Sequence, residues 1–186
     1  GGGGGGSGFV LRQSSDAGKL EFAVGNVDGA AGYQTIVASK NPVAYWKFDE
    51  TSGTAISDSI GTAHGTASAG VTVNQSGAVA TSNTSLSFSG TTSYVSVPST
   101  GSLNITTNGI SIALWVRPTS SSGYQGLVAK GIGTGGNYSY LLSLDQNTLY
   151  PSLYMTGVNA SWANRATTAL TLNAWNHVVV TYNPAT

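Results

Sequence analysis

The chain has 186 residues, of which 86 are Gly, Ser, Thr or Asn. Only 8% of the residues are charged, and seven Lys and Arg balance seven Asp and Glu, so the formal net charge is zero. We therefore predict no nucleic-acid partner, because phosphate contacts need clustered Lys and Arg. Charge-driven disorder is also excluded, since 40% of the residues are hydrophobic and nine Tyr, four Trp and four Phe are available for a core.

The sequence excludes several further classes of protein. The chain has no cysteine, which excludes disulfides, Cys-ligated metal centres and a Cys nucleophile. No segment approaches the roughly 18 apolar residues of a membrane span, so we predict no membrane insertion.

The first forty residues contain a linker and short strand-like runs. Residues 1–8 are seven glycines and one serine, a composition that predicts a flexible linker. Residues 9–12 and 19–24 are short apolar-rich runs separated by turn residues, and they predict a hairpin. Residues 33–39 fit a helical turn or a strand, and the sequence does not decide between them.

The remainder of the chain predicts many short strands. Asn41-Pro42 marks a boundary, since Pro restricts the residue before it and cannot donate to a ladder. Residues 43–50 alternate and offer Trp46 and Phe48 to a core. Gly/Ser/Thr-rich turns and no convincing helix predict an all-β, antiparallel two-sheet sandwich or jelly roll. The further predicted strands are residues 70–74, 85–88, 94–97, 110–117, 126–129, 138–144, 149–155, 166–172 and 175–182.

Six stretches carry strand motifs in one order. They are PVAYWKFDETSG at 42–53, DSIG with HGT at 58–66, LSFSG with YVSVP at 86–98, ISIALWVRP at 110–118, GLVAKG at 126–131 and LNAWNHVVVTY at 172–182. In this order they resemble the strands of the laminin-G-like, concanavalin-A-like lectin/glucanase jelly-roll family. The resemblance covers roughly residues 42–183 and implies the same two-sheet sandwich.

The resemblance also predicts how the chain is organised. Residues 41–186 are expected to form the jelly roll, lacking the family's last strands, and residues 9–40 a hairpin and connector that end a preceding domain or complete the fold. Missing strands would leave unpaired sheet edges, which folded proteins avoid. We expect the fold to be completed by residues beyond 186 in a longer parent chain, or by residues 9–24. The latter would pack into the gap within one chain or between subunits.

The residues that could support catalysis are few. His177 lies inside an apolar strand, and His64 lies in a Gly/Thr loop with no partner visible in the sequence. The related glycanases carry an E-x-D-x-x-E pattern on one strand, which none of the seven acids forms. Asp49 and Glu50 are adjacent and point to opposite faces of a strand. We predict that the protein is not an enzyme.

The resemblance implies a structural calcium ion near the first loop in some members of the family. Asp58 matches the loop position, and Asp49 or Glu50 lies near it in the sequence. Carboxylate oxygens are the ligands that Ca²⁺ prefers. The alternative is that the side chain of Asp58 caps a turn.

One tryptophan differs from the others in its surroundings. Trp162 lies in the polar loop 159–165, whereas the other three lie in core-strand patterns. Because sugars stack on exposed aromatic faces, we predict ligand contacts by Trp162, Asn164 and, in a Gly/Ser loop, Tyr124. Trp162 could equally cover a loop cluster or an inter-subunit seam.

Two classes of function remain. The first is a structural or adhesive surface module, a building block or decoration of a virion, fibre or surface layer, with neighbouring subunits as partners in a homo-oligomer or filament. The second is a carbohydrate-binding module with a glycan as its partner. Both place the protein outside the cell, on a cell surface or on a virion. Low charge and the Gly/Ser/Thr/Asn richness favour the first.

Overall fold

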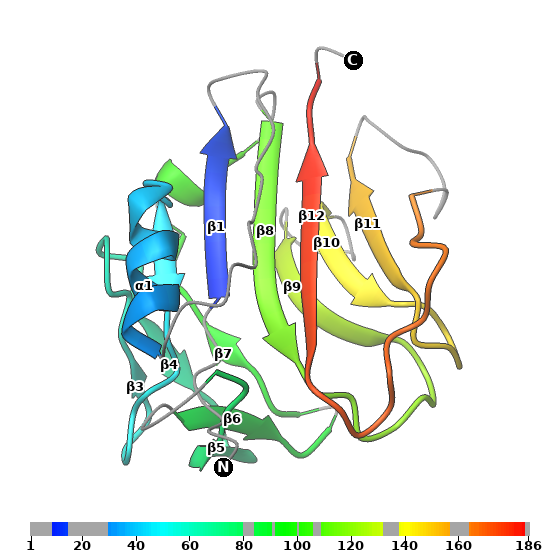
Figure 1. Ribbon diagram of the computed structural model, residues 1–186, viewed down its shortest axis with the longest axis horizontal. Helices are drawn as coiled ribbons and strands as arrows, with labels where there is room; N and C mark the ends of the chain where they lie inside the picture. The colour runs from blue at the N-terminus through cyan, green and yellow to red at the C-terminus, as the bar shows by residue number, and fades with distance from the viewer. Residues whose placement is uncertain are drawn as a thin grey trace. The chain divides into compact units, whose positions relative to one another are not determined.

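The computed structural model describes residues 9–14, 30–79, 84–90, 92–99, 101–105, 109–131, 138–156 and 164–184. Its elements in chain order are β1 (Phe9–Ser14), α1 (Ala30–Ser39), β2 (Ala44–Trp46), β3 (Ala55–Ile56), β4 (Gly65–Ala67), β5 (Val71–Ser76), β6 (Thr84–Phe88), β7 (Val95–Ser96), η1 (Gly101–Leu103), β8 (Gly109–Val116), β9 (Gln125–Gly131), β10 (Tyr138–Leu144), β11 (Pro151–Met155) and β12 (Asn176–Tyr182). The sheets have the strand orders β12-β8-β1-β2, β11-β10-β9, β3-β4-β7 and β5-β6 (Figure 1). The predicted all-β, antiparallel class is confirmed. No helix among the described residues is long and apolar enough to cross a membrane.

The chain divides into two compact units, residues 1–115 with 179–186 and residues 116–178. In the first unit, β1 lies between β2 and β8 and is antiparallel to both (Figure 1). Val10 is opposite Tyr45 on one side and Ala113 on the other. The first strand of the chain therefore shares a sheet with strands of the segment that resembles a jelly roll. The predicted hairpin partner, residues 19–24, lies outside the described residues.

Helix α1 corrects the expectation that the chain has no convincing helix. Its residues Tyr33 and Val37 are one turn apart, and both pack against Tyr45 and Ala113. The helix ends where Asn41 takes a positive φ of 49° and donates its N–H to the carbonyl of Ala38 at 3.0 Å. An Asn in this conformation followed by Pro is a common helix stop, so Asn41-Pro42 marks the end of α1.

Strand β2 is shorter than the predicted strand at 43–50. Phe48 has a φ of 57°, in the left-handed region, so the backbone cannot stay extended there. Tyr45 and Trp46 are both buried, at 4% and 3% exposure, although alternation predicts that only Trp46 faces a core. The second buried face arises because α1 covers the sheet on the side of Tyr45.

Asp58 is a buried carboxylate, 5% exposed, whose oxygens are surrounded by backbone N–H groups. Oδ1 accepts the N–H of Tyr45 at 2.9 Å and of Ile60 at 3.0 Å, and Oδ2 accepts that of Ala63 at 3.1 Å. Burial by itself raises the pKa of Asp58, but these bonds and one from Gly61 outweigh burial, and the pKa is lowered. The side chain ties β2 to the loop that follows β3.

The second unit contains the sheet β11-β10-β9 (Figure 1). One face of β10 and β11 is fully apolar and buried, and consists of Tyr140, Leu142, Leu144, Pro151, Leu153 and Met155. The strand predicted at 166–172 is wrong. Ala166 and Leu170 donate to the carbonyls of Pro151 and Leu149, but residues 166–169 are exposed and no ladder forms there. This segment follows the edge of β11 without becoming a strand, because its exposed side chains bury no face.

We expect Asp58→Asn to destabilise the protein by about 2–4 kcal/mol, because an amide NH₂ would replace an acceptor that faces backbone donors. Denaturant unfolding followed by tryptophan fluorescence measures the change. Asp49→Asn is the control, since Asp49 forms a partly exposed ion pair with Lys47 at 2.9 Å. Its loss should cost less than about 1 kcal/mol. Equal losses in the two variants would contradict the role assigned to Asp58.

Burial lowers the pKa of His177, in β12, below its ordinary value. Below about pH 6.5 the unfolded chain therefore binds a proton that the folded chain does not, and stability falls as the pH falls. We expect the free energy of unfolding to decrease from about pH 7 to about pH 5. In the His177→Gln variant, the free energy of unfolding should decrease less over the same pH range. Unfolding curves at a series of pH values test it, and parallel pH profiles would speak against it.

Candidate functional site

The end of the sheet in the second unit brings an acid and a tyrosine together. Leu144 pairs with Pro151, and one residue farther along, Asp145 donates its N–H to the carbonyl of Tyr150 at 3.0 Å. Because side chains alternate along strands, Asp145 and Tyr150 lie on the face opposite the buried apolar one. This second face is the candidate site.

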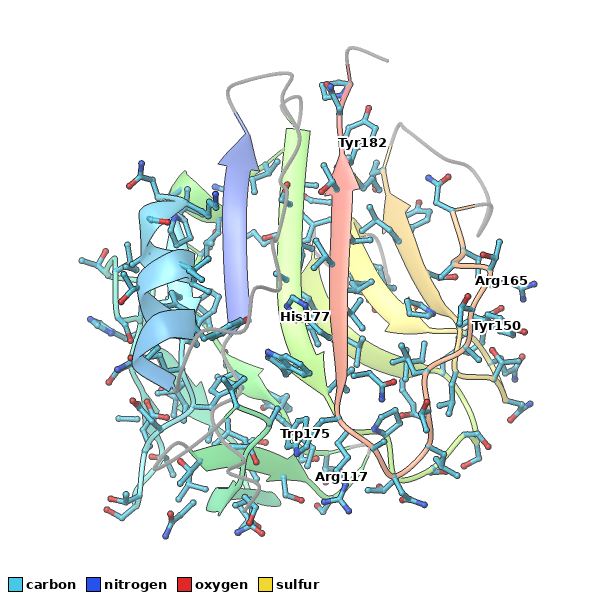
Figure 2. All side chains as sticks on the ribbon, in the orientation of Figure 1. Arg117, Tyr150, Arg165, Trp175, His177 and Tyr182 are labelled. Carbon is cyan, nitrogen blue, oxygen red and sulfur yellow. The ribbon has the colours of Figure 1, made fainter. Side chains whose placement is uncertain are left out.

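Arg165 joins this face from the segment beside β11. It is opposite Ser152 in an isolated antiparallel bridge, which places it on the same face. Nη1 of Arg165 lies 2.9 Å from Oδ2 of Asp145. The guanidinium also lies over the ring of Tyr150, 4.9 Å from the centroid, in a cation–π contact. Figure 2 shows Tyr150 and Arg165 next to each other.

Tyr124 extends the same end of the sheet. It precedes Gln125, which pairs with Leu144, so its place in the register is beside Asp145. Its loop is fixed to the β10–β11 turn, because Gly123 donates to Oδ1 of Asn147 at 3.0 Å and accepts from the N–H of Asn147 at 3.3 Å. Tyr124 is 56% exposed.

We call this surface the tyrosine–arginine face, and it includes Tyr124, Asp145, Tyr150 and Arg165. Tyr154 and Leu141 are opposite each other on β11 and β10, and alternation along the strands places both on the same face. Beneath it lie Ser143 and Ser152, which are opposite each other on β10 and β11 and are 3% and 1% exposed. Neither hydroxyl has a hydrogen-bond partner among the described residues. The middle of the face therefore consists of two small, buried and uncharged side chains, with the larger residues around them.

The electrostatics of the face are set by the ion pair. The hydrogen bond from Arg165 holds the pKa of Asp145 below its usual range, and the N–H of Gln146, 2.9 Å from Oδ1, adds to the effect. Asp145 is therefore ionised across the neutral and mildly acidic range. The pair carries no net charge, and its guanidinium lies over the ring of Tyr150.

The predicted ligand-binding residues are placed as follows. Tyr124 belongs to the face. Asn164 is exposed beside Arg165, and its carbonyl accepts the N–H of Leu153 at 3.0 Å. Trp162 lies outside the described residues. These assignments stay predictions.

Sequence reasoning named Tyr124 and missed the other members of the face, including the three that contact one another, Asp145, Tyr150 and Arg165. Their association depends on two registers, β10 with β11 and β11 with the segment at Arg165. A sequence signal did exist, since an acid and a tyrosine bracket the short QNTL turn between two strands.

The two predicted calcium ligands have other contacts in the structure. Asp58 accepts backbone N–H groups on both oxygens and so fits a cation poorly, whereas Asp49 pairs with Lys47. Oε1 of Glu50 accepts the N–H of Ser57 at 2.8 Å, and Oε2 is buried with no hydrogen-bond partner in the part of the chain that the structure describes. Among the described residues, no three His, Asp or Glu side chains gather as a metal site. Calcium binding stays a prediction.

One family model matches residues 89–186, just over half of the chain, and is described as the concanavalin A-like lectin/glucanases superfamily. Comparison with curated proteins and with solved structures gives no match. Laminin-G-like domains of this superfamily are generally non-catalytic and typically extracellular, although the superfamily also includes glucanases. The fold is that of a carbohydrate-binding or adhesive module. Its motifs, its antiparallel sheets and this match together show that the chain belongs to the concanavalin A-like lectin/glucanase superfamily.

Proposed function

We propose that this chain is a non-catalytic adhesive module that works outside the cell and binds glycans through its tyrosine–arginine face. The observation that carries the proposal is the arrangement of Arg165, held over the ring of Tyr150 by Asp145, next to the exposed ring of Tyr124. Sugars present apolar C–H faces that stack on aromatic rings and hydroxyls that need both donors and acceptors. The face offers all of these groups.

The rigidity of the face supports binding. Arg165 is fixed at two points, by the carboxylate of Asp145 and by the ring of Tyr150. The loop of Tyr124 is fixed to the adjacent turn by the side-chain Oδ1 and the backbone N–H of Asn147, which both bond to Gly123. Side chains that are already ordered lose less conformational entropy when a ligand binds.

The state of the acids supports a non-catalytic role. A glycosidase needs two carboxyl groups beside the scissile bond, with the pKa of the general acid raised. Asp58 and Asp145 both have lowered pKa values, because their charged forms are hydrogen-bonded. A carboxyl group that is stabilised as the anion is a poor proton donor.

A building block of an extracellular assembly is the second candidate function. Phe88 and Tyr94 are 49% and 59% exposed in the first unit, and exposed aromatic side chains are enriched in protein contacts. Ordered polymers in electron micrographs without glycan binding would favour this function over the first.

A structural calcium ion near the first loop is a separate proposal. The buried, unpartnered Oε2 of Glu50 is an acceptor of the kind that calcium uses, and Asp49 is its neighbour in the chain. Glu50 and Asp49 are therefore the residues that would hold the ion, in place of Asp58.

Replacing Tyr124 by Ala should weaken glycan binding about tenfold, the effect of losing roughly 1.4 kcal/mol of stacking. Tyr150→Ala should weaken it at least as much, because Arg165 also loses its support. Glycan-array screening followed by calorimetry provides the measurement. Tyr94→Ala is the matched control, since Tyr94 is as exposed as Tyr124 but lies in the other unit. The proposal fails if Tyr94→Ala reduces binding as much as Tyr124→Ala does.

Calcium at a concentration of 100 times its dissociation constant should stabilise the protein by about 2.7 kcal/mol. Melting temperatures in calcium and in chelator give the readout, and Glu50→Gln should abolish the difference between them. An unchanged melting temperature in chelator would end the calcium proposal.

A further inference from the structure

The tyrosine–arginine face has a charge pattern that selects among glycans. Its one cation, Arg165, is already paired at 2.9 Å with its one anion, Asp145, and its other members carry no charge. Below the face, the buried hydroxyls of Ser143 and Ser152 add no charge. The face is therefore polar but electrically neutral.

We infer that this face binds a neutral saccharide through adjacent ring hydroxyls, and that it disfavours acidic glycans. The inference rests on the glycan-binding function proposed above. It names the chemical class of the ligand and the two side chains, Asp145 and Arg165, that set it.

The hydrogen-bonding capacity of the pair suits a vicinal diol. A guanidinium carries five N–H donors, and the bond to Asp145 uses one of them. Each carboxylate oxygen of Asp145 accepts one bond, Oδ1 from Gln146 and Oδ2 from Arg165, and each has a further lone pair. A donor and an acceptor side by side match two neighbouring hydroxyls, because each hydroxyl can both donate and accept.

An acidic sugar meets a penalty at the same place. Its carboxylate or sulfate would have to replace Asp145 on Arg165, or bind with Asp145 nearby. Two like charges at contact distance repel each other, and they do so more strongly near a protein surface than in bulk water. The hydrogen bond that keeps Asp145 ionised maintains this repulsion across the neutral and mildly acidic range.

Stacking provides the remaining affinity without charge. One side of the Tyr150 ring is covered by the guanidinium of Arg165, and Tyr124 is more than half exposed. The exposed part of the Tyr124 side chain is the surface offered to the apolar face of a pyranose. We expect the sugar to stack on Tyr124 while its hydroxyls reach the ion pair.

The test uses the full chain and two sets of probes. Neutral oligosaccharides of glucan, mannan, galactan and xylan form the first set, and polygalacturonate, alginate and heparin the second. We expect binding to one or more neutral probes, at least tenfold tighter than to any acidic probe. Affinity should change less than twofold when NaCl is raised from about 50 to about 200 mM, because a neutral sugar has no bound counterions to release when it binds.

Two variants at the pair make the test specific. Asp145→Asn frees Arg165 and should raise affinity for acidic probes at least fivefold while lowering affinity for the neutral ligand. Arg165→Met should weaken neutral binding without improving acidic binding. Tyr94→Ala should change neither, and circular dichroism confirms that each variant is folded.

The outcomes separate this inference from the proposed function. Binding to acidic probes as tight as to neutral ones, or a steep loss of affinity with salt, overturns the inference and leaves glycan binding standing. Binding to no probe of either set overturns the proposed function and the inference with it. Neutral binding that is unaffected by Asp145→Asn and Arg165→Met also overturns the inference, because the pair then plays no part.

Discussion

The burial of one carboxylate constrains the first unit more than any other single interaction. Asp58 can be ionised at 5% exposure because backbone N–H groups of β2 and of its own loop point at its oxygens. The loop in turn must pass close to the carboxylate. A Cβ at Gly61 would lie 2.8 Å from Oδ2 of Asp58 and 3.1 Å from the carbonyl of Val43, so a larger residue would displace the side chain that holds the loop. Trp46 holds the same loop from β2, because its Nε1–H donates to the carbonyl of Ala63 at 2.7 Å.

Much of the fold could be predicted from local pattern, and the failures have a common cause. Strands β8, β10 and β12 lie within one residue of their predicted bounds, since each is a long run of β-branched, aromatic or leucine side chains. Residues 33–39 could not be assigned to a helical turn or to a strand because their sequence carries only a weak apolar face, and packing on Tyr45 and Ala113 decides the conformation of α1. The segment at 166–172 has strand-forming threonines but no face to bury. Tertiary contacts decide both cases.

The candidate site was less predictable because it depends on register. Tyr124 could be named from its polar loop alone, whereas the contact between Asp145 and Arg165 joins residues twenty positions apart. A shift of one residue in the pairing of β10 with β11 would move Asp145 or Tyr150 to the apolar face. Arg165 would then lose its contact with the residue that moved. The apolar residues of the opposite face fix that register. The core of the second unit therefore determines the geometry of the tyrosine–arginine face, and the sequence pattern predicts that core more readily than it predicts the face.

A chain with so few charges uses them mainly to build structure. Each acid that the structure describes has a defined partner: Asp49 has Lys47, Glu50 has the N–H of Ser57, Asp58 has a set of backbone N–H groups and Asp145 has Arg165. The glycan recognition proposed for this chain therefore relies on aromatic rings, on neutral polar groups and on one paired set of charges, whose contacts depend on shape and hydrogen-bond geometry. This distribution of charge agrees with the non-catalytic role proposed above. Proton transfer needs a carboxyl group free to exchange its proton, and hydrogen bonds to the anionic forms of Asp58 and Asp145 oppose that exchange.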